Sequence, residues 1–146
     1  MVQSIGVVGL GVMGTAIVTR LVETGHEVRA FDVNPDAVAR AVGLGALAAS
    51  TPVEAAAAGV VILSLPNAPI VEAAAFGADG AATGTPTLVI DLSSIDPGAT
   101  AEFARHAEAS GHAWVDAPLS GGAPAALAGR LTLMLSDILR AAFSHS

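Results

Sequence analysis

The sequence predicts a doubly wound α/β fold built on a mostly parallel sheet. Short β-branched runs alternate with helical patterns as far as about residue 115, and such alternation with short loops is typical of right-handed βαβ units. The runs are apolar nearly throughout, as in strands that helices cover on both faces. A capping residue followed by proline begins several of the helices. This device occurs at Asn34-Pro35, Thr51-Pro52 and Asp96-Pro97.

The first strand is expected at Ile5–Val8, and a glycine-rich turn leads from it into the first helix. That helix has an apolar stripe at helical spacing. The stripe consists of Met13, Ile17, Val18, Leu21 and Val22. The second strand, Val28–Asp32, follows a helix stop at Gly25, because glycine favours the end of a helix.

Four further strands are expected, each after another helix stop. They lie at Ala46–Ala48 (a weak pattern), Val60–Leu65, Leu88–Asp91 and Ala113–Asp116. The expected spatial order is 3-2-1-4-5-6, the usual order for two βαβαβ halves. Leu131–Leu135 is expected to add an edge strand beside the sixth. The sequence leaves its direction open, with an antiparallel strand favoured.

Composition sets the broad class of the chain. Its 146 residues suit one domain, which we assign to residues 1–136, with residues 137–146 as a frayed or disordered tail. A net charge of −7 argues against binding to nucleic acid or to an anionic membrane, and the apolar runs are too short to cross a bilayer. The absence of cysteine excludes disulfides and a thiolate nucleophile. A soluble cytoplasmic domain is expected.

The stretch 9-GLGVMG-14 directly follows the first strand and opens a helix. In such a turn the first glycine permits a tight bend, the second lets the backbone approach a pyrophosphate, and the third lets helix and strand pack closely. Gly9, Gly11 and Gly14 occupy these places, and the start of the helix would offer free N–H groups to phosphate. Alone the motif is weak, because glycines in such turns are often only structural.

Asp32 supplies the second half of this fingerprint, an acidic residue that ends the next strand about 20 residues on. Its carboxylate can accept hydrogen bonds from ribose hydroxyls and would repel a 2′-phosphate. A helix cap is the structural alternative, but Asn34 already has that role. No arginine follows Asp32 in the adjacent turn. The sequence therefore favours NAD over NADP as the cofactor.

Polar residues gather at the predicted carboxyl ends of the strands, the edge where open α/β sheets bind ligands. They are Asp32, Ser64, Asn67, Asp91, Ser93, Ser94 and Asp116. Ser93 and Ser94 are equally well explained as the start of the next helix. The histidines are not spaced for a metal, and each is expected to be a solvated side chain. They are His26, His106, His112 and His145.

Several motifs together resemble the β-hydroxyacid dehydrogenases. This family includes 3-hydroxyisobutyrate dehydrogenase and tartronate semialdehyde reductase, and is related to 6-phosphogluconate dehydrogenase. The motifs are "GLGVMG", "GHEVRAFD", "VVILSLPN", "VIDLSSIDP", "DAPLSGG" and "LAGRLTLML". The resemblance covers roughly residues 4–135 and implies a Rossmann fold with NAD(P)-dependent hydride transfer. The substrate would be a small 3-hydroxy acid or semialdehyde.

The resemblance also implies roles for individual residues. The pyrophosphate would be held by Gly9, Leu10, Gly11, Val12, Met13 and Gly14, and the ribose by Asp32. Leu65, Pro66 and Asn67 would lie along the adenosine, and Ser94 near the nicotinamide. Ser120, Gly121 and Gly122 would bind the substrate, since a hydroxyl and two glycine N–H groups form a compact anion nest. The alternative for these last three is a flexible turn after the sixth strand.

The chain departs from the family in one respect that bears on catalysis. Members carry a catalytic lysine in a helical second domain, usually in a G-x-x-x-K-x-x-N-N run, and this sequence contains no lysine. Arginine cannot replace it as a base because it stays protonated. No catalytic residue is therefore assigned, and the sequence is interpreted as a truncated, catalytically incomplete dehydrogenase. Self-association through the surface left by the missing domain is also expected.

Two other interpretations stay open. The chain could be a non-catalytic dinucleotide-binding module that a partner chain completes. It could also be a fragment of an imine-directed or sugar-acid-directed relative, because the residues that select the substrate would mostly lie in the second domain.

Overall fold

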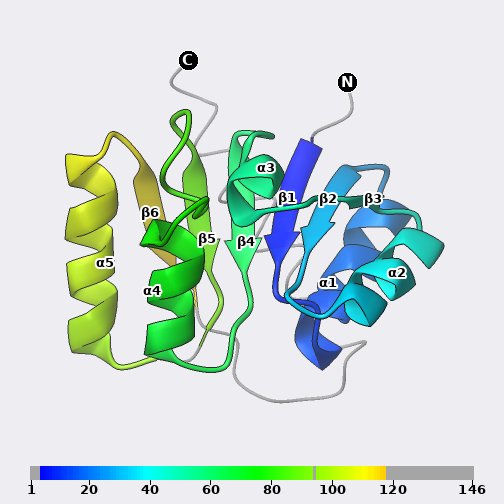
Figure 1. Cartoon of the computed structure of the whole chain (residues 1–146), viewed down its shortest axis with the longest axis horizontal. Helices are drawn as coiled ribbons and strands as arrows, with labels where there is room; N and C mark the ends of the chain where they lie inside the picture. Colours follow the sequence, from blue (N-terminus) through cyan, green and yellow to red (C-terminus); the bar gives the residue numbers. More distant parts are fainter. Residues whose placement is uncertain (1–3, 94, 118–146) are drawn as a thin grey trace.

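Six parallel strands form one sheet in the order β3-β2-β1-β4-β5-β6 (Figure 1). The computed structural model describes residues 4–93 and 95–117. The strands are β1 (Ser4–Val8), β2 (Glu27–Phe31), β3 (Leu47–Ala48), β4 (Val60–Leu63), β5 (Leu88–Asp91) and β6 (Ala113–Asp116). The predicted doubly wound α/β fold and its strand order are confirmed.

Helices connect the strands in the described part of the chain. They are α1 (Val12–Glu23), α2 (Pro35–Gly43), α3 (Pro52–Ala56), α4 (Ala68–Phe76) and α5 (Pro97–Ala109). The predicted caps at the starts of α2, α3 and α5 are present, because the side chains of Asn34, Thr51 and Asp96 each accept a hydrogen bond from a first-turn N–H group. Asn67 caps α4 in the same way by accepting from the N–H of Ile70 at 3.0 Å.

The two faces of the sheet carry separate cores because side chains alternate along each strand. Ile5 and Val7 of β1 pack with Ile17 and Leu21 of α1 and with the alanines of α2. The next residue, Val8, points to the other face and belongs to a core with α3, α4 and α5. In Figure 1, α4 and α5 lie at the β5 and β6 side of the sheet, and α1 and α2 lie at the β2 and β3 side.

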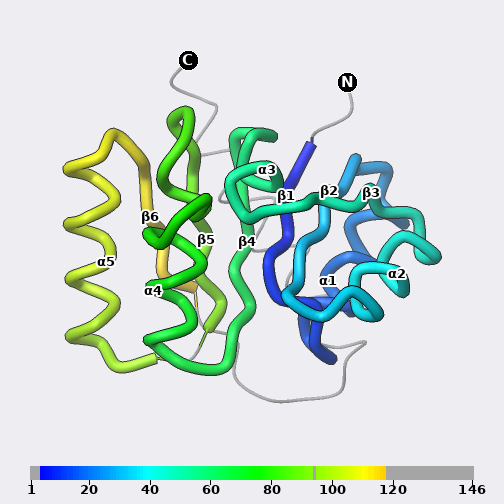
Figure 2. The backbone as a smooth tube through the Cα atoms, viewed as in Figure 1, coloured from blue at the N-terminus to red at the C-terminus, as the bar shows by residue number. Residues whose placement is uncertain are grey.

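The six strands in the described part of the chain are parallel, so their carboxyl ends share one edge of the sheet. Figure 2 follows the chain out of β1, β2 and β4 at the lower edge of the view. The predicted site residues that follow β1, β2 and β4 therefore lie on the same side of the molecule.

Several predicted boundaries differ from the structure by one or two residues. β2 ends at Phe31, not Asp32, and β4 ends at Leu63, not Leu65. In both places the chain leaves the ladder at residues that line a cavity described below. The predicted strand Leu131–Leu135, the domain limit at residue 136 and the tail 137–146 lie outside the described residues. None of the helices within the described ranges has the length and apolar character needed to span a bilayer.

Gly6 gives the fold a constraint that sequence patterns do not reveal. It sits in the middle of β1, and a methyl group added there would collide with the carbonyl oxygen of Ala55 in α3. The short helix α3 therefore packs directly on the backbone of β1.

We expect Gly6→Ala to destabilise the protein by about 1–3 kcal/mol, the usual cost of overpacking a core. Gly43→Ala is the matched control, since a methyl group at the end of α2 meets nothing within 4 Å. That change should be neutral or stabilising by up to ~1 kcal/mol, because alanine favours the helix. Urea unfolding of both variants would decide, and equal free energies of unfolding would contradict the close contact.

Candidate functional site

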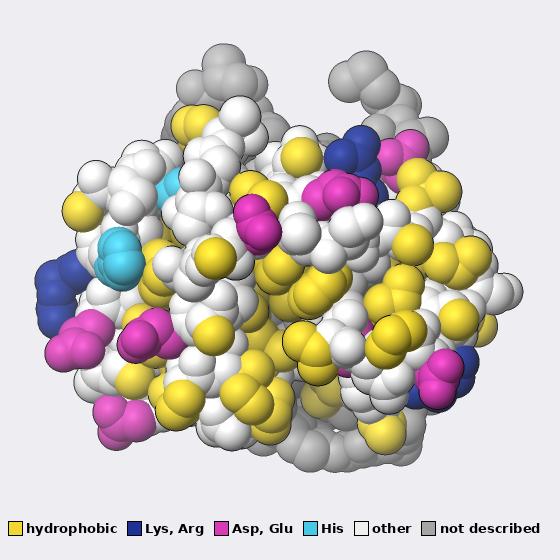
Figure 3. Space-filling model, in the orientation of Figure 1, with side chains coloured by type: hydrophobic (Ala, Val, Ile, Leu, Met, Phe, Trp, Pro, Cys, Tyr) yellow, Lys and Arg dark blue, Asp and Glu magenta, His cyan; other side chains and the backbone are white. Residues whose placement is uncertain are grey.

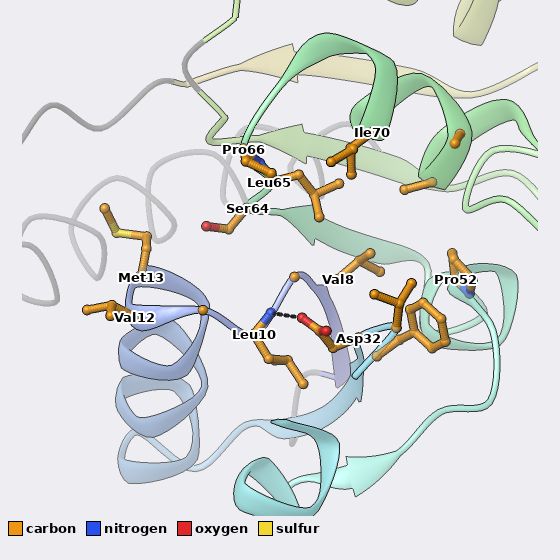
Figure 4. A pocket seen from close by; sticks show the side chains of 16 residues that line it. Val8, Leu10, Val12, Met13, Asp32, Pro52, Ser64, Leu65, Pro66 and Ile70 are labelled. Carbon is orange, nitrogen blue, oxygen red and sulfur yellow. Dashed lines mark hydrogen bonds between the residues drawn. The ribbon is translucent and has the colours of Figure 1, made fainter. Parts of the chain in front are cut away.

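A cavity of about 680 Å³ opens at the carboxyl edge of the sheet. The residues that line it come from the β1–α1 turn, the end of β2, the segment after β4, the start of α3 and one face of α4. They are Val8, Gly9, Leu10, Gly11, Val12, Met13, Phe31, Asp32, Val33, Pro52, Ser64, Leu65, Pro66, Ile70, Ala73 and Ala74. Figure 4 shows the residues of α1 and of the segment after β4 on opposite sides of this space.

The structure brings most of the predicted cofactor residues together around this cavity. The predicted residues in its lining are Gly9, Leu10, Gly11, Val12, Met13, Asp32, Leu65 and Pro66. Gly14 and Asn67 do not line it, since Gly14 packs on Gly9 and Asn67 caps α4. The predicted residues Ser94, Ser120, Gly121 and Gly122 lie outside the described residues.

The β1–α1 turn depends on two of its glycines for shape. Gly9 has a φ of +99°, and a methyl group there would collide with the carbonyl oxygen of Ser64. A methyl group on Gly14 would collide with the carbonyl oxygen of Gly9. Because Gly9 and Gly14 lack side chains, the first helical turn of α1 can pack directly against the end of β1.

Gly11 differs from these two, because a methyl group at its position would meet nothing within 4 Å. It is the N-cap of α1, and no side chain caps that helix. The N–H groups of the first turn of a helix have no partner within the helix, and its N-terminus attracts anions. Open space at Gly11 thus borders a helix N-terminus that can receive a phosphate group.

Asp32 is held in place by two backbone N–H groups. Its Oδ2 accepts a hydrogen bond from Leu10 at 2.7 Å, and its Oδ1 accepts one from Asn34 at 2.8 Å. Figure 4 shows the first of these bonds, which ties the end of β2 to the β1–α1 turn. Each carboxylate oxygen has a further lone pair, and Asp32 is only half-buried at the cavity wall. The carboxylate can accept hydrogen bonds from two adjacent hydroxyl groups of a ligand.

The rest of the cavity is largely apolar. Val12, Val33 and Ile70 line it and are 81%, 90% and 42% exposed, which is unusual for large aliphatic side chains. Figure 3 shows hydrophobic side chains gathered between α4 and α2, over the ends of β4 and β1. Ligand cavities commonly combine such apolar walls with a few fixed polar groups. The apolar wall can contact an apolar part of a ligand, while Asp32 and the N-terminus of α1 can bind its polar groups.

Sequence patterns missed part of this wall. The lining residues that were not predicted are Val8, Phe31, Val33, Pro52, Ile70, Ala73 and Ala74, together with Ser64, which was noted only as a polar strand end. The positions in α4 follow the i, i+3, i+4 spacing of one helix face, so a helical-face pattern could have found them. Pro52 could not be found in this way, because only the folded chain brings α3 beside β2.

Two carboxyl groups lie side by side at the same sheet edge. Asp91 ends β5 and is paired in register with Asp116, which ends β6. Asp91 is fully buried, its Oδ1 accepts a hydrogen bond from the N–H of Ser93 at 2.9 Å, and its Oδ2 has no partner. Burial raises the pKa of Asp91, the nearby Asp116 carboxylate adds to this effect, and hydrogen bonding from Ser93 opposes it. Smaller burial at Asp116 also raises the pKa of that group.

The prediction that every histidine is solvated is wrong for His112. This side chain is 6% exposed, and its Nδ1 accepts a hydrogen bond from the N–H of Thr87 at 3.1 Å. His106 is exposed but stacks on Phe76, with ring centroids 4.0 Å apart. Within residues 4–93 and 95–117, no group of three or more His, Cys, Asp or Glu side chains could hold a metal ion.

Residues 4–138 match the family described as the NAD binding domain of 6-phosphogluconate dehydrogenase. The 2-(hydroxymethyl)glutarate dehydrogenase of Eubacterium barkeri is 41% identical over 134 residues, which are 90% of this chain and 44% of that enzyme. The 3-sulfolactaldehyde reductase of Escherichia coli strain K12 is 37% identical over 134 residues, which are 90% of this chain and 45% of that enzyme.

A solved structure is also similar. It is that of a Mycobacterium tuberculosis 3-hydroxyisobutyrate dehydrogenase with L-serine, which has a TM-score of 0.75 and 38% sequence identity. The match covers 84% of this chain and 42% of that one. The chain therefore spans less than half the length of each of these relatives.

We expect Asp91→Asn to change how stability depends on pH. Because the pKa of Asp91 is raised above its ordinary 3.8 in the folded protein, the folded state holds this proton more tightly than the unfolded chain. Wild-type stability therefore falls as pH rises from about 4 through the raised pKa. Asparagine keeps an acceptor for Ser93 and removes the titration, so the variant gains stability relative to wild type over that interval.

Unfolding in urea at a series of pH values measures this difference. Asp116→Asn is the matched variant, since it removes one cause of the raised pKa of Asp91. It should narrow the pH interval over which wild-type stability falls. A stability difference between Asp91→Asn and wild type that stays constant with pH would contradict the burial of an ionisable Asp91.

Proposed function

This chain belongs to the family of the NAD-binding domain of 6-phosphogluconate dehydrogenase. From that premise we propose that it binds NAD and forms the cofactor-binding part of a β-hydroxyacid dehydrogenase. One observation carries the proposal. A single cavity contains both an uncapped helix N-terminus at Gly11 and the fixed carboxylate of Asp32. These groups match the two polar parts of the adenosine half of a dinucleotide, its pyrophosphate and its ribose.

The residues present fit this cofactor. The pyrophosphate would lie against the backbone of Gly11, Val12 and Met13, where no Cβ fills the space at Gly11. The ribose hydroxyls would donate to Asp32, and the adenine would lie among the exposed apolar side chains of Val33 and Ile70. The N-terminus of α1 stabilises the negative charge of the phosphates, because its dipole presents its positive end there.

The bound nicotinamide would accept or donate the hydride. We propose that the substrate is a small 3-hydroxy acid or semialdehyde, held by Ser120, Gly121 and Gly122, with Ser94 near the nicotinamide. The motif "DAPLSGG" supports this assignment, because a hydroxyl and adjacent glycine N–H groups suit a carboxylate. Relatives named as a dehydrogenase of 2-(hydroxymethyl)glutarate and a reductase of 3-sulfolactaldehyde support the same class of substrate.

Oxidation of an alcohol also needs a group that takes the hydroxyl proton. The sequence has no lysine and six arginines, and arginine side chains stay protonated. We propose that residues 1–146 hold the cofactor and that the proton-transfer group comes from another segment or a partner chain. A dinucleotide-binding module completed in this way accounts equally for the cavity, and self-association of the chain remains a prediction.

We expect NAD to bind at least ~10-fold more tightly than NADP, because a 2′-phosphate beside the fixed Asp32 carboxylate meets like charge in a partly buried site. Asp32→Asn should bring the two affinities closer by removing the charge while keeping the size of the side chain. Asp32→Ala should narrow the difference too, but it leaves the N–H groups of both Leu10 and Asn34 without their acceptor, whereas asparagine leaves one of them.

Calorimetric titration of both cofactors measures these affinities. Asp36→Asn is a matched control, since this exposed aspartate lies in the first turn of α2 and does not line the cavity. It should leave the ratio of affinities unchanged. Equal or tighter binding of NADP by wild type would refute the preference for NAD.

We expect residues 1–146 alone to show essentially no dehydrogenase turnover. A missing general acid or base typically lowers the rate by a factor of about 10²–10⁴, and loss of substrate positioning lowers it further. The assay uses NAD with a panel of small 3-hydroxy acids, and NADH with semialdehydes. Turnover near ~1 per second, within the usual enzyme range, would refute this proposal. His106, His112 and Asp116 would then be the first groups to replace.

A further inference from the structure

We propose that Ser93, held by Asp91, positions the segment that forms the far wall of the cavity, an inference that rests on the proposed dinucleotide binding. The segment is residues 64–67. A chain of hydrogen bonds leads to it from the end of β5. The carboxylate of Asp91 accepts from the N–H of Ser93 at 2.9 Å, and the Oγ of Ser93 accepts from the N–H of Leu65 at 2.9 Å.

Two of the three residues in this connection are buried. Asp91 is 0% exposed and Ser93 is 4% exposed, although neither lines the cavity. A buried hydroxyl and a buried carboxylate are costly unless they form hydrogen bonds. Asp91 and Ser93 lie two residues apart in the segment that leaves β5, and the hydrogen bonds that each accepts from a backbone N–H group offset part of this cost.

The bond to Leu65 replaces pairing that the sheet no longer supplies. β4 ends at Leu63, and the last ladder-like bonds join the Ser64 N–H to Val8 and the Leu92 N–H to Leu63, each at 2.9 Å. One residue later the Leu65 N–H is only partly buried and donates to Ser93. Leu65 is thereby held between β5 and the cavity, on the path that leads to the cap of α4 at Asn67.

The resemblance assigns Leu65, Pro66 and Asn67 to the adenosine, but in the structure Leu65 and Pro66 lie away from the Asp32 carboxylate, which would hold the ribose (Figure 4). The position of this segment should therefore matter more for a whole dinucleotide than for a ligand that Asp32 holds. Figure 4 shows Ser64, Leu65 and Pro66 across the cavity from Val12 and Met13, whereas Asp32 and Pro52 lie toward its other end. A ligand anchored mainly at Asp32, such as AMP, depends little on the segment. A ligand that extends past Gly11 must pass between α1 and Leu65.

The test compares NAD and AMP binding to the full chain by calorimetry. Ser93→Ala should weaken NAD by about 5- to 10-fold, as expected for one lost hydrogen bond, and should change the AMP affinity less than ~2-fold. Asp91→Asn keeps an acceptor for Ser93 and should weaken NAD less than Ser93→Ala does. Thr83→Val is the matched control, since it removes a hydroxyl that donates to Gly80 at 2.7 Å in the loop before β5.

A second measurement follows the Leu65 amide directly. Its hydrogen exchange, monitored by nuclear magnetic resonance, should accelerate in Ser93→Ala and stay unchanged in Thr83→Val. Equal weakening of NAD and AMP by Ser93→Ala, or an unchanged NAD affinity, would overturn the positioning role alone. Failure of wild type to bind NAD would refute the proposed function, and this inference with it.

Discussion

The close contact between Gly14 and the carbonyl of Gly9 is the constraint on which the site depends. Because neither position tolerates a side chain, α1 can begin directly against the end of β1. That placement exposes the first turn of α1 at the carboxyl edge of the sheet and leaves Gly11 facing open space. The close packing of α1 on β1 and the exposure of the N-terminus of α1, the proposed phosphate site, therefore have the same structural origin.

Asp32 connects this turn to the second strand. Its two hydrogen bonds to Leu10 and Asn34 hold the β1–α1 turn, the end of β2 and the start of α2 in a fixed relation. The same carboxylate lines the cavity and is the proposed acceptor for the hydroxyl groups of a ligand. On the other side, buried Ser93 holds the Leu65 backbone, so both walls are supported by polar groups whose partners are mainly backbone N–H groups. Such preorganisation reduces the ordering cost that a ligand must overcome.

Local patterns predicted the strand order, the glycine-rich turn and the family. They also predicted that Asp32 follows the second strand at the carboxyl edge of the sheet. Each of these predictions depends on motifs whose residues are close in sequence. Contacts between distant segments were not predictable in this way. The bond from Leu65 to Ser93 joins residues 28 positions apart. The buried His112 accepts a hydrogen bond from Thr87, which precedes β5 and lies 25 positions earlier. The cap that the Asn67 Oδ1 provides for α4 was not predicted either, and the assignment of Asn67 to the adenosine remains a prediction. The assignments of Ser94 and of residues 120–122 lie outside the described residues and remain predictions.

The most direct test of the account is a nuclear magnetic resonance titration of the full chain with NAD, with each backbone amide observed separately. The account predicts that the largest shifts occur at Gly11, Asp32 and Leu65, which surround the cavity. The exposed residues Leu44 and Leu47, at the end of α2 and in β3, should not shift. Saturable NAD binding that leaves the Gly11 and Asp32 amides unchanged would contradict the assignment of this cavity as the dinucleotide site.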